Sequence, residues 1–279
     1  MCNGPLLGKL LIFALPLMLS GILQLLFNAA DIIVVGRFTG SHALAAVGST
    51  SSLINLLVNL FIGFSIGANV LTAQYYGAKD QKNIHQTIHT SILISLIGGI
   101  ILIAVGVLLA RPLLELMATP EDVLDQATLY MKIYFCGMPA RMVYNFGAAI
   151  LRAIGDTRRP LYFLFTAGVL NVFLNLFFVI VFHMGVAGVA LATIISQTLS
   201  AILVVRCLTN LDGICRLYLK QLKIYPEKLL RIVQIGLPAG LQGAVFSISN
   251  VLSQSSVNSF GSIAMAGNTA ASNLEGFVY

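Results

Sequence analysis

Long apolar segments recur along the whole sequence, and they constrain its fold more than any other feature. The first of them, Leu10–Val35, is long enough to cross a lipid bilayer, which takes about 20 apolar residues. The chain is 58% hydrophobic and only 9% charged, whereas soluble domains carry about 25% charged residues. We therefore expect an all-α polytopic membrane protein that resides in a lipid bilayer. The expected helices cover residues 10–35, 45–76, 84–109, 121–153, 161–182, 186–208, 226–260 and 262–279.

The first apolar segment contains residues that are unusual inside a membrane. Gln24, Asn28 and Asp31 are spaced i, i+4, i+7, so they share one face of a helix, and we expect this face to look into a polar cavity. A carboxylate within a span is costly and by default marks a functional site. The alternative is a structural carboxylate satisfied by Asn28 and nearby hydroxyl groups. Pro16 removes a backbone donor, which predicts a hinge one or two turns before the polar face.

Further polar residues fall inside the other expected helices. Asn171 and Asn175 are i, i+4 neighbours, and Thr193 on the next helix could complete an oxygen-rich cluster with Asp31. Such a cluster would suit Na⁺, or would hydrogen-bond the protonated form of Asp31, or would only hold packed helices together. Besides Gln24 and Asn28, the candidate cavity-lining residues are Asn55, Asn59, Asn250, Gln254 and Glu275.

Motifs for metal, nucleotide or catalytic chemistry are missing from the sequence. The four cysteines show no metal-ligand spacing, and no glycine-rich phosphate loop opens a helix. The basic residues behind the net charge of +6 lie in short connections between apolar segments, where they set membrane orientation rather than bind nucleic acid. We therefore expect no enzyme, no organic cofactor, no structural metal and no nucleic-acid partner.

The basic residues are distributed unequally between the two sides of the membrane. Of the 16 Lys and Arg residues, all fall at the amino terminus and the even-numbered connections except Arg37, Arg111, Lys132 and Arg141. The positive-inside rule then predicts a cytoplasmic amino terminus, and it places the long basic connection Thr209–Tyr225 on the same side.

An internal repeat organises the chain. The segment around Pro16 resembles the segment around Pro238, and GSHALAAVG from Gly40 resembles GSIAMAGNT from Gly261. An even number of expected helices separates the two copies, so both run in the same direction across the membrane. Parallel repeats of this kind form the two lobes of many transporters.

The repeat predicts the domain organisation. We expect an amino-terminal six-helix lobe over residues 1–225 and the first one or two helices of a second lobe over residues 226–279, with the rest of that lobe missing. The second copy places Asn250 opposite Asn28 but has Ser253 in the place of Asp31, so the two lobes are chemically unequal.

The most specific motifs in the sequence are DIIVVGRFTGSHALAAVG, GANVLTAQYYGAKDQ, LRAIGDTRRP, NVFLN followed by MGVAGVALATIISQ, and NLEGFVY. Together they resemble the multidrug and toxic compound extrusion (MATE) family, and the resemblance covers essentially the whole chain. It implies a twelve-helix, two-lobed, monomeric protein of the bacterial inner membrane. Such a protein exports cationic or amphipathic drugs and toxic metabolites in exchange for H⁺ or Na⁺.

The resemblance also implies roles for single residues. Asp31 matches the ion-coupling acid of the first helix, and Pro16 matches the proline at which that helix bends. Asn171 and Thr193 match polar residues of a cation site in the amino-terminal lobe, which would hold Na⁺ together with Asp31.

Three positions bear on how far the resemblance extends. Asn175 stands where many members carry Asp, which removes one carboxylate from the cation site. Phe246 stands near the position at which one branch carries a coupling Glu. Glu275, in contrast, fits an acid of the eighth helix in many bacterial members.

Two other functions remain open from the sequence. A lipid-linked precursor flippase of related architecture would need several cations in its cavity, and Arg141 is the only arginine well inside an expected helix. The second is an inert, truncated half-transporter without its second lobe.

Overall fold

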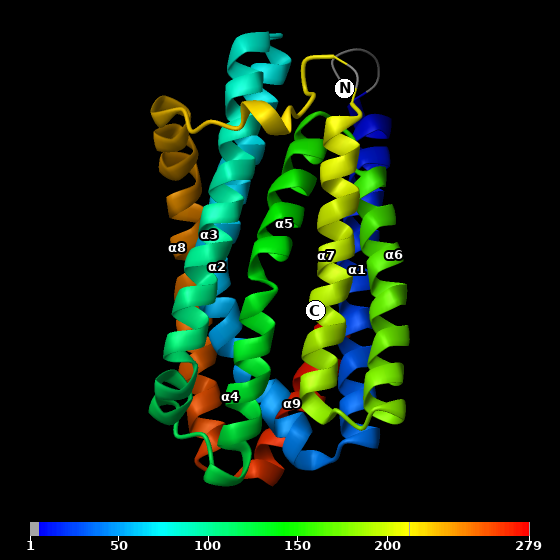
Figure 1. The fold of residues 1–279 in the computed structure, drawn as a ribbon, viewed down its shortest axis with the longest axis vertical. Coiled ribbons are helices and arrows are strands. Elements are labelled where there is room, and N and C mark those ends of the chain that lie inside the picture. The colour runs from blue at the N-terminus through cyan, green and yellow to red at the C-terminus, as the bar shows by residue number, and fades with distance from the viewer. Residues whose placement is uncertain (1–5, 212, 279) are drawn as a thin grey trace.

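Helices make up almost all of the computed structural model, which describes residues 6–211 and 213–278 (Figure 1). No strand occurs in these residues, so the all-α prediction is confirmed. Tyr279, the last residue of the final expected helix, lies outside the described residues. The main helices are α1 (Leu6–Phe38), α2 (Ser41–Gly77), α3 (Gln81–Leu116), α4 (Glu121–Cys136), α5 (Met138–Ala153), α6 (Arg158–Leu176), α7 (Gly185–Thr209), α8 (Pro226–Asn258) and α9 (Ser262–Val278).

Within the part of the chain that the structure describes, six helical segments are long and apolar enough to cross a membrane. They are formed by α1, α2, α3, α7, α8 and by α6 together with the π-helix η1 (Phe177–Val181) that continues it. The prediction of a multi-pass membrane protein is therefore confirmed. A short 3₁₀ turn, η2 (Leu219–Gln221), lies in the linker between α7 and α8.

The expected continuous helix over residues 121–153 is instead two helices, α4 and α5, which meet at Gly137. Pro139 lies in the first turn of α5 and has no N–H to donate to the carbonyl group of Phe135, which interrupts the helical hydrogen bonds. Gly99 of α3 allows this break to pack closely, because a Cβ atom there would lie 2.8 Å from the nitrogen of Pro139. The break is thus built into the contact between α3 and α5.

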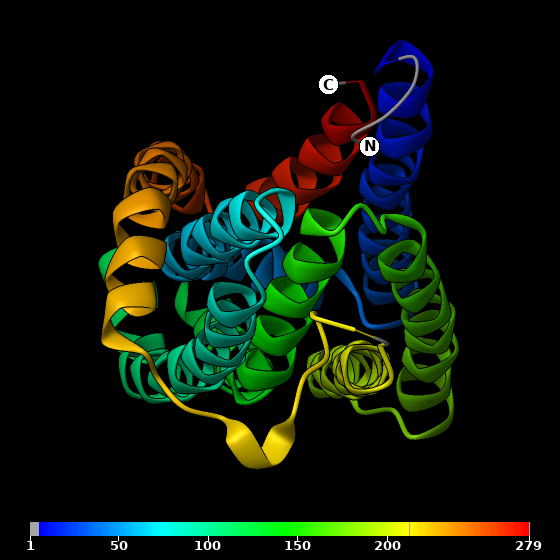
Figure 2. The ribbon, with the colours of Figure 1, turned by 90° about the horizontal axis from the view of Figure 1, so that it is seen from above.

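Around four glycines, the backbones of α2 and α8 pack directly against each other. Gly63 and Gly67 of α2 face Gly236 and Gly240 of α8, and a Cβ atom added at Gly67 would lie 2.9 Å from the nitrogen of Gly236. Small residues four positions apart allow helices in lipid to approach this closely. As a result α8, the expected start of the second lobe, lies directly on α2 (Figure 2).

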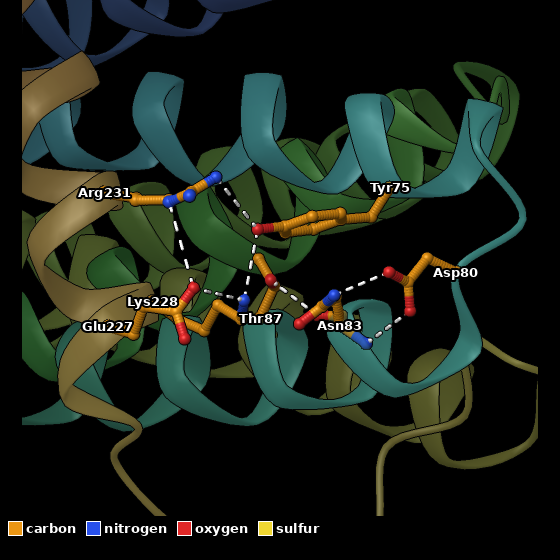
Figure 3. A network of polar contacts seen from close by, with 7 residues as sticks. All are labelled: Tyr75, Asp80, Asn83, Thr87, Glu227, Lys228 and Arg231. Carbon is orange, nitrogen blue, oxygen red and sulfur yellow. Dashed lines mark hydrogen bonds and ion pairs between the residues drawn. The ribbon is translucent and has the colours of Figure 1, made fainter.

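Polar contacts fasten the start of α8 to α2, next to the start of α3 (Figure 3). The Nζ atom of the buried Lys228 donates to the hydroxyl of Tyr75 at 3.1 Å and lies 3.3 Å from a carboxylate oxygen of Glu227. Nearby, Asp80 caps α3 by accepting hydrogen bonds from the side chain and backbone N–H groups of Asn83. These hydrogen bonds hold the pKa of Asp80 below its usual value.

The linker between α7 and α8 is hydrogen-bonded to α3. The backbone N–H of Tyr218 donates to Nε2 of the buried His89 at 3.1 Å, and the N–H of Tyr225 donates to Oγ1 of Thr90 at 3.2 Å. The Nδ1 atom of His89 lies 2.7 Å from a backbone carbonyl oxygen one turn earlier. The Nδ1 contact thus fixes the ring on α3, and Nε2 holds the linker in place.

The two copies of the repeat share a local conformation. Gly40 precedes α2 with a φ of 101°, and Gly261 precedes α9 with a φ of 92°. Residues other than glycine rarely adopt such positive φ values, so the same residue type serves the same turn in both copies. The boundary between two lobes near residue 225 stays a prediction.

Candidate functional site

Three helices bring the expected cluster of polar residues together. Asn175 of α6 donates a hydrogen bond from Nδ2 to the carboxylate of Asp31 on α1, and the same atom lies 3.2 Å from Oδ1 of Asn171. Asn171 in turn donates from Nδ2 to Oγ1 of Thr193 on α7 at 3.4 Å. We call these four residues the Asp31 network. The spatial grouping expected from the sequence is therefore present.

A close contact between α1 and α6 sets the position of this network. Phe27 lies one turn before Asp31 on α1, and its ring packs onto Gly168 of α6, where a Cβ atom would overlap the ring. Gly168, Asn171 and Asn175 are spaced i, i+3, i+7 and so share one face of α6. The glycine lets the two helices approach until the carboxylate and the amide meet. Immediately after Asn175 and Leu176, the backbone changes to the π-helix η1, a feature often found at functional sites.

The electrostatic environment of Asp31 is that of an acid without a cation. Its side chain is half-buried and forms no ion pair with any residue that the structure describes. Asn175 is completely buried, and its Oδ1 atom has no hydrogen-bond partner in the described part of the chain. A carboxylate in this setting is one that a proton or a metal cation can neutralise. The network also presents only oxygen atoms as possible ligands, which is the donor type that hard cations prefer.

Residues on α4 and α5 lie near this network and were not among the predicted site residues. Tyr130 is buried in α4 and lies near Asp31. Its ring stacks on that of Tyr134, whose hydroxyl accepts a hydrogen bond from Arg141. The i, i+4 spacing of the two tyrosines is the sequence signal that could have indicated a second polar face.

Several predicted cavity-lining residues do not join the Asp31 network. Gln24 and Asn28 are exposed, because no described helix covers their face of α1, so only Asp31 of the expected polar face enters the cluster. Asn55, Asn250 and Glu275 are exposed as well. Their role in lining a substrate cavity stays a prediction.

Two other candidates form contacts between helices. Asn59 of α2 donates to Oγ of Ser247 on α8 at 2.7 Å. Gln254 donates to Oδ1 of Asn258 at 2.9 Å, and Asn258 donates to the carbonyl oxygen of Met117 at 3.0 Å. These side chains tie α8 to α2 and to the end of α3.

Pro16 is buried within α1, which continues as one helix on both sides of it. The hydroxyl of Ser20 donates to the carbonyl oxygen of Pro16 at 2.7 Å. The hinge therefore stays a prediction.

These features define a multi-pass helical membrane protein with an acidic polar site between three of its helices. A family model described as MatE matches residues 16–177. The chain belongs to this family, the multidrug and toxic compound extrusion proteins.

Individual relatives agree with the assignment. The chain is 31% identical, over 91% of its length, to "Probable multidrug resistance protein YoeA" of Bacillus subtilis (strain 168). It is also 31% identical, over 99% of its length, to "Probable multidrug resistance protein YpnP" of the same organism. A solved inward-facing structure of a multidrug resistance MATE family transporter matches with a TM-score of 0.81 and 25% identity, over 89% of this chain. The chain spans only 57% and 62% of the two curated relatives and 57% of the solved chain.

Proposed function

We propose that the protein is a secondary active multidrug efflux antiporter, which exports cationic or amphipathic small molecules in exchange for H⁺ or Na⁺. The observation that carries this proposal is the hydrogen-bonded chain from Asp31 through Asn175 and Asn171 to Thr193. It couples the charge of one acid to the packing of α1 against α6 and α7. The relatives named as multidrug resistance proteins support the substrate class.

In this mechanism, the charge of Asp31 controls how α1 packs. The ionised carboxylate accepts a hydrogen bond from Asn175, and a hydrogen bond to a charged group contributes about 1.5–3 kcal/mol. Neutralisation by a proton weakens that bond, so α1 is freed to bend at Pro16 and to shrink the substrate cavity. Ion and substrate then favour opposite conformations, which is the requirement for exchange.

A sodium ion would be held by the same network. Asp31, Asn171 and Thr193 would supply a carboxylate, an amide and a hydroxyl oxygen, and the free Oδ1 atom of Asn175 would be a fourth oxygen. The charge of the bound sodium ion would neutralise the carboxylate of Asp31, as a proton would.

The experiment is drug efflux by the full-length protein in everted membrane vesicles, measured with a fluorescent cationic dye. Asp31→Asn should reduce efflux driven by a pH or Na⁺ gradient to the level of vesicles without the protein. Asp125→Asn is the matched control, because Asp125 is an exposed acid that pairs with Arg111 away from the network. Near-normal efflux by Asp31→Asn would overturn the proposal.

A further inference from the structure

A groove on the surface of the helical bundle lies outside the Asp31 network. It is formed by α3, α5 and α7, and its volume of about 480 Å³ lies within the range of about 300–1,000 Å³ found for small-molecule sites. In Figure 1 these helices face the viewer, and the linker between α7 and α8 crosses the top of the same face. No residue of the Asp31 network lines the groove.

The walls of the groove are mostly apolar. Pro139, Ala140 and Ala201 are small and leave room between the larger side chains of the neighbouring helices. Arg206, in the last turn of α7, is the only charged one among the described residues that line the groove, and Leu219 of η2 lies beside this end. The α7 wall is one helix face, on which residues recur every three or four positions: Thr198, Ala201, Ile202, Val205, Arg206 and Thr209.

The length of this wall matches half of a bilayer. From Thr198 to Thr209 a helix rises about 16 Å, at about 1.5 Å per residue. The hydrocarbon core of a bilayer is about 30 Å thick, so one leaflet spans about 15 Å. The α7 wall is thus about as long as one leaflet is thick, and Arg206 lies about 12 Å along the helix from Thr198, at the end that adjoins the linker.

The linker adds positive charge at the same end. Between Arg206 and Tyr225 the sequence contains three more basic residues, Arg216, Lys220 and Lys223, against one acid, Asp212. All three of these basic side chains are exposed. Each Lys or Arg near an anionic membrane surface contributes about 1 kcal/mol of attraction, so this end favours an anionic group.

We propose that the groove binds an anionic glycerophospholipid, with one acyl chain along the α7 wall and its phosphate at Arg206. A soluble phosphate would leave the apolar wall unused, and a zwitterionic lipid would bring its own ammonium group to the basic end of the groove. A lipid with an anionic headgroup can place an acyl chain along the apolar α7 wall and its headgroup at Arg206, and so it matches both features of the groove. Bound there, the lipid would join α7 to the linker through Leu219 and Arg206.

The test compares lipid occupancy of the purified full-length protein by native mass spectrometry. Delipidated protein is mixed with phosphatidylglycerol and phosphatidylcholine of identical acyl chains, and we expect phosphatidylglycerol to be preferred. Arg206→Gln should reduce that preference about fivefold, which corresponds to about 1 kcal/mol. The matched control is Arg158→Gln, because Arg158 is exposed at the same end of the bundle but does not line the groove.

A second pair of variants tests the apolar wall. Ile202→Trp should fill the groove and reduce the occupancy of both lipids, whereas Ile195→Trp, on the same helix but outside the groove, should not. Both isoleucines are exposed, so neither change disturbs the packed core. The proposal is overturned if Arg206→Gln and Arg158→Gln lower the preference equally, if Ile202→Trp retains wild-type occupancy, or if glycerol phosphate displaces the lipid.

Discussion

Replacing Gly63 with alanine tests the backbone contact between α2 and α8. The added Cβ atom would lie 2.6 Å from the carbonyl oxygen of Gly236 and would also meet the backbone of Gly240. Carbon and carbonyl oxygen atoms between helices normally stay about 3.3–3.6 Å apart, so the two helices must separate by about 0.7 Å or more. Such overpacking costs about 1–3 kcal/mol, which outweighs the gain of up to about 1 kcal/mol that alanine brings to a helix.

The matched control is Gly21→Ala in α1. No atom lies within 4 Å of a Cβ atom built at Gly21, so this variant should stabilise the protein by about 0.5–1 kcal/mol. The measurement is the free energy of unfolding in mixed micelles titrated with sodium dodecyl sulfate. The two substitutions are chemically identical, so opposite signs can arise only from their surroundings. Equal or greater stability of Gly63→Ala relative to Gly21→Ala would refute the close packing of α2 on α8.

Two further predictions concern the Asp31 network and the linker. Asn175→Asp places a second carboxylate beside Asp31, and two adjacent carboxylates require a shared proton or a cation. The concentration of Na⁺ needed for half-maximal dye efflux should fall at least about tenfold, equivalent to about 1.4 kcal/mol; an unchanged Na⁺ dependence would argue against a cation at this position. Burial raises the pKa of the Cys215 thiol to about 11. In a variant whose only cysteine is Cys215, alkylation by iodoacetamide should therefore be slow at pH 8 and keep accelerating to about pH 11, whereas a plateau near pH 9 would contradict this burial.

The outlines of the fold could be predicted from the sequence because membrane spans are local features. About 20 consecutive apolar residues predict a span wherever they occur, and helical spacing alone placed Asn171 and Asn175 on one face. The interruption at Gly137 was missed, although Pro139 was visible, because a proline inside an apolar segment is compatible with either a bend or a break. The similar positive φ values at Gly40 and Gly261 show that the repeat was a sound guide to local conformation.

The candidate site was predicted in its residue types but only partly in its contacts. Gln24 and Asn28 share the face of Asp31 by spacing, yet they are exposed, since spacing does not say which part of a helix its neighbours cover. Asn59 and Gln254 bind neighbouring side chains of the bundle, and their role in lining a cavity stays a prediction. The sequence pattern of an Asn or Gln inside a span is the same whether its side chain lines a cavity or hydrogen-bonds a neighbouring side chain.

By itself, the sequence determined that this chain is a helical membrane protein, that it carries an acid within its first span, and that it contains an internal repeat. Only the tertiary structure decided that Asp31 meets Asn175, which lies 144 positions away, and that α8 packs on α2. The physical reason is that hydrophobic length acts within one segment, whereas helix partners are selected by surface shape. Gly168 beneath Phe27 and Gly63 against Gly240 create that shape, and each depends on a residue far away in the chain.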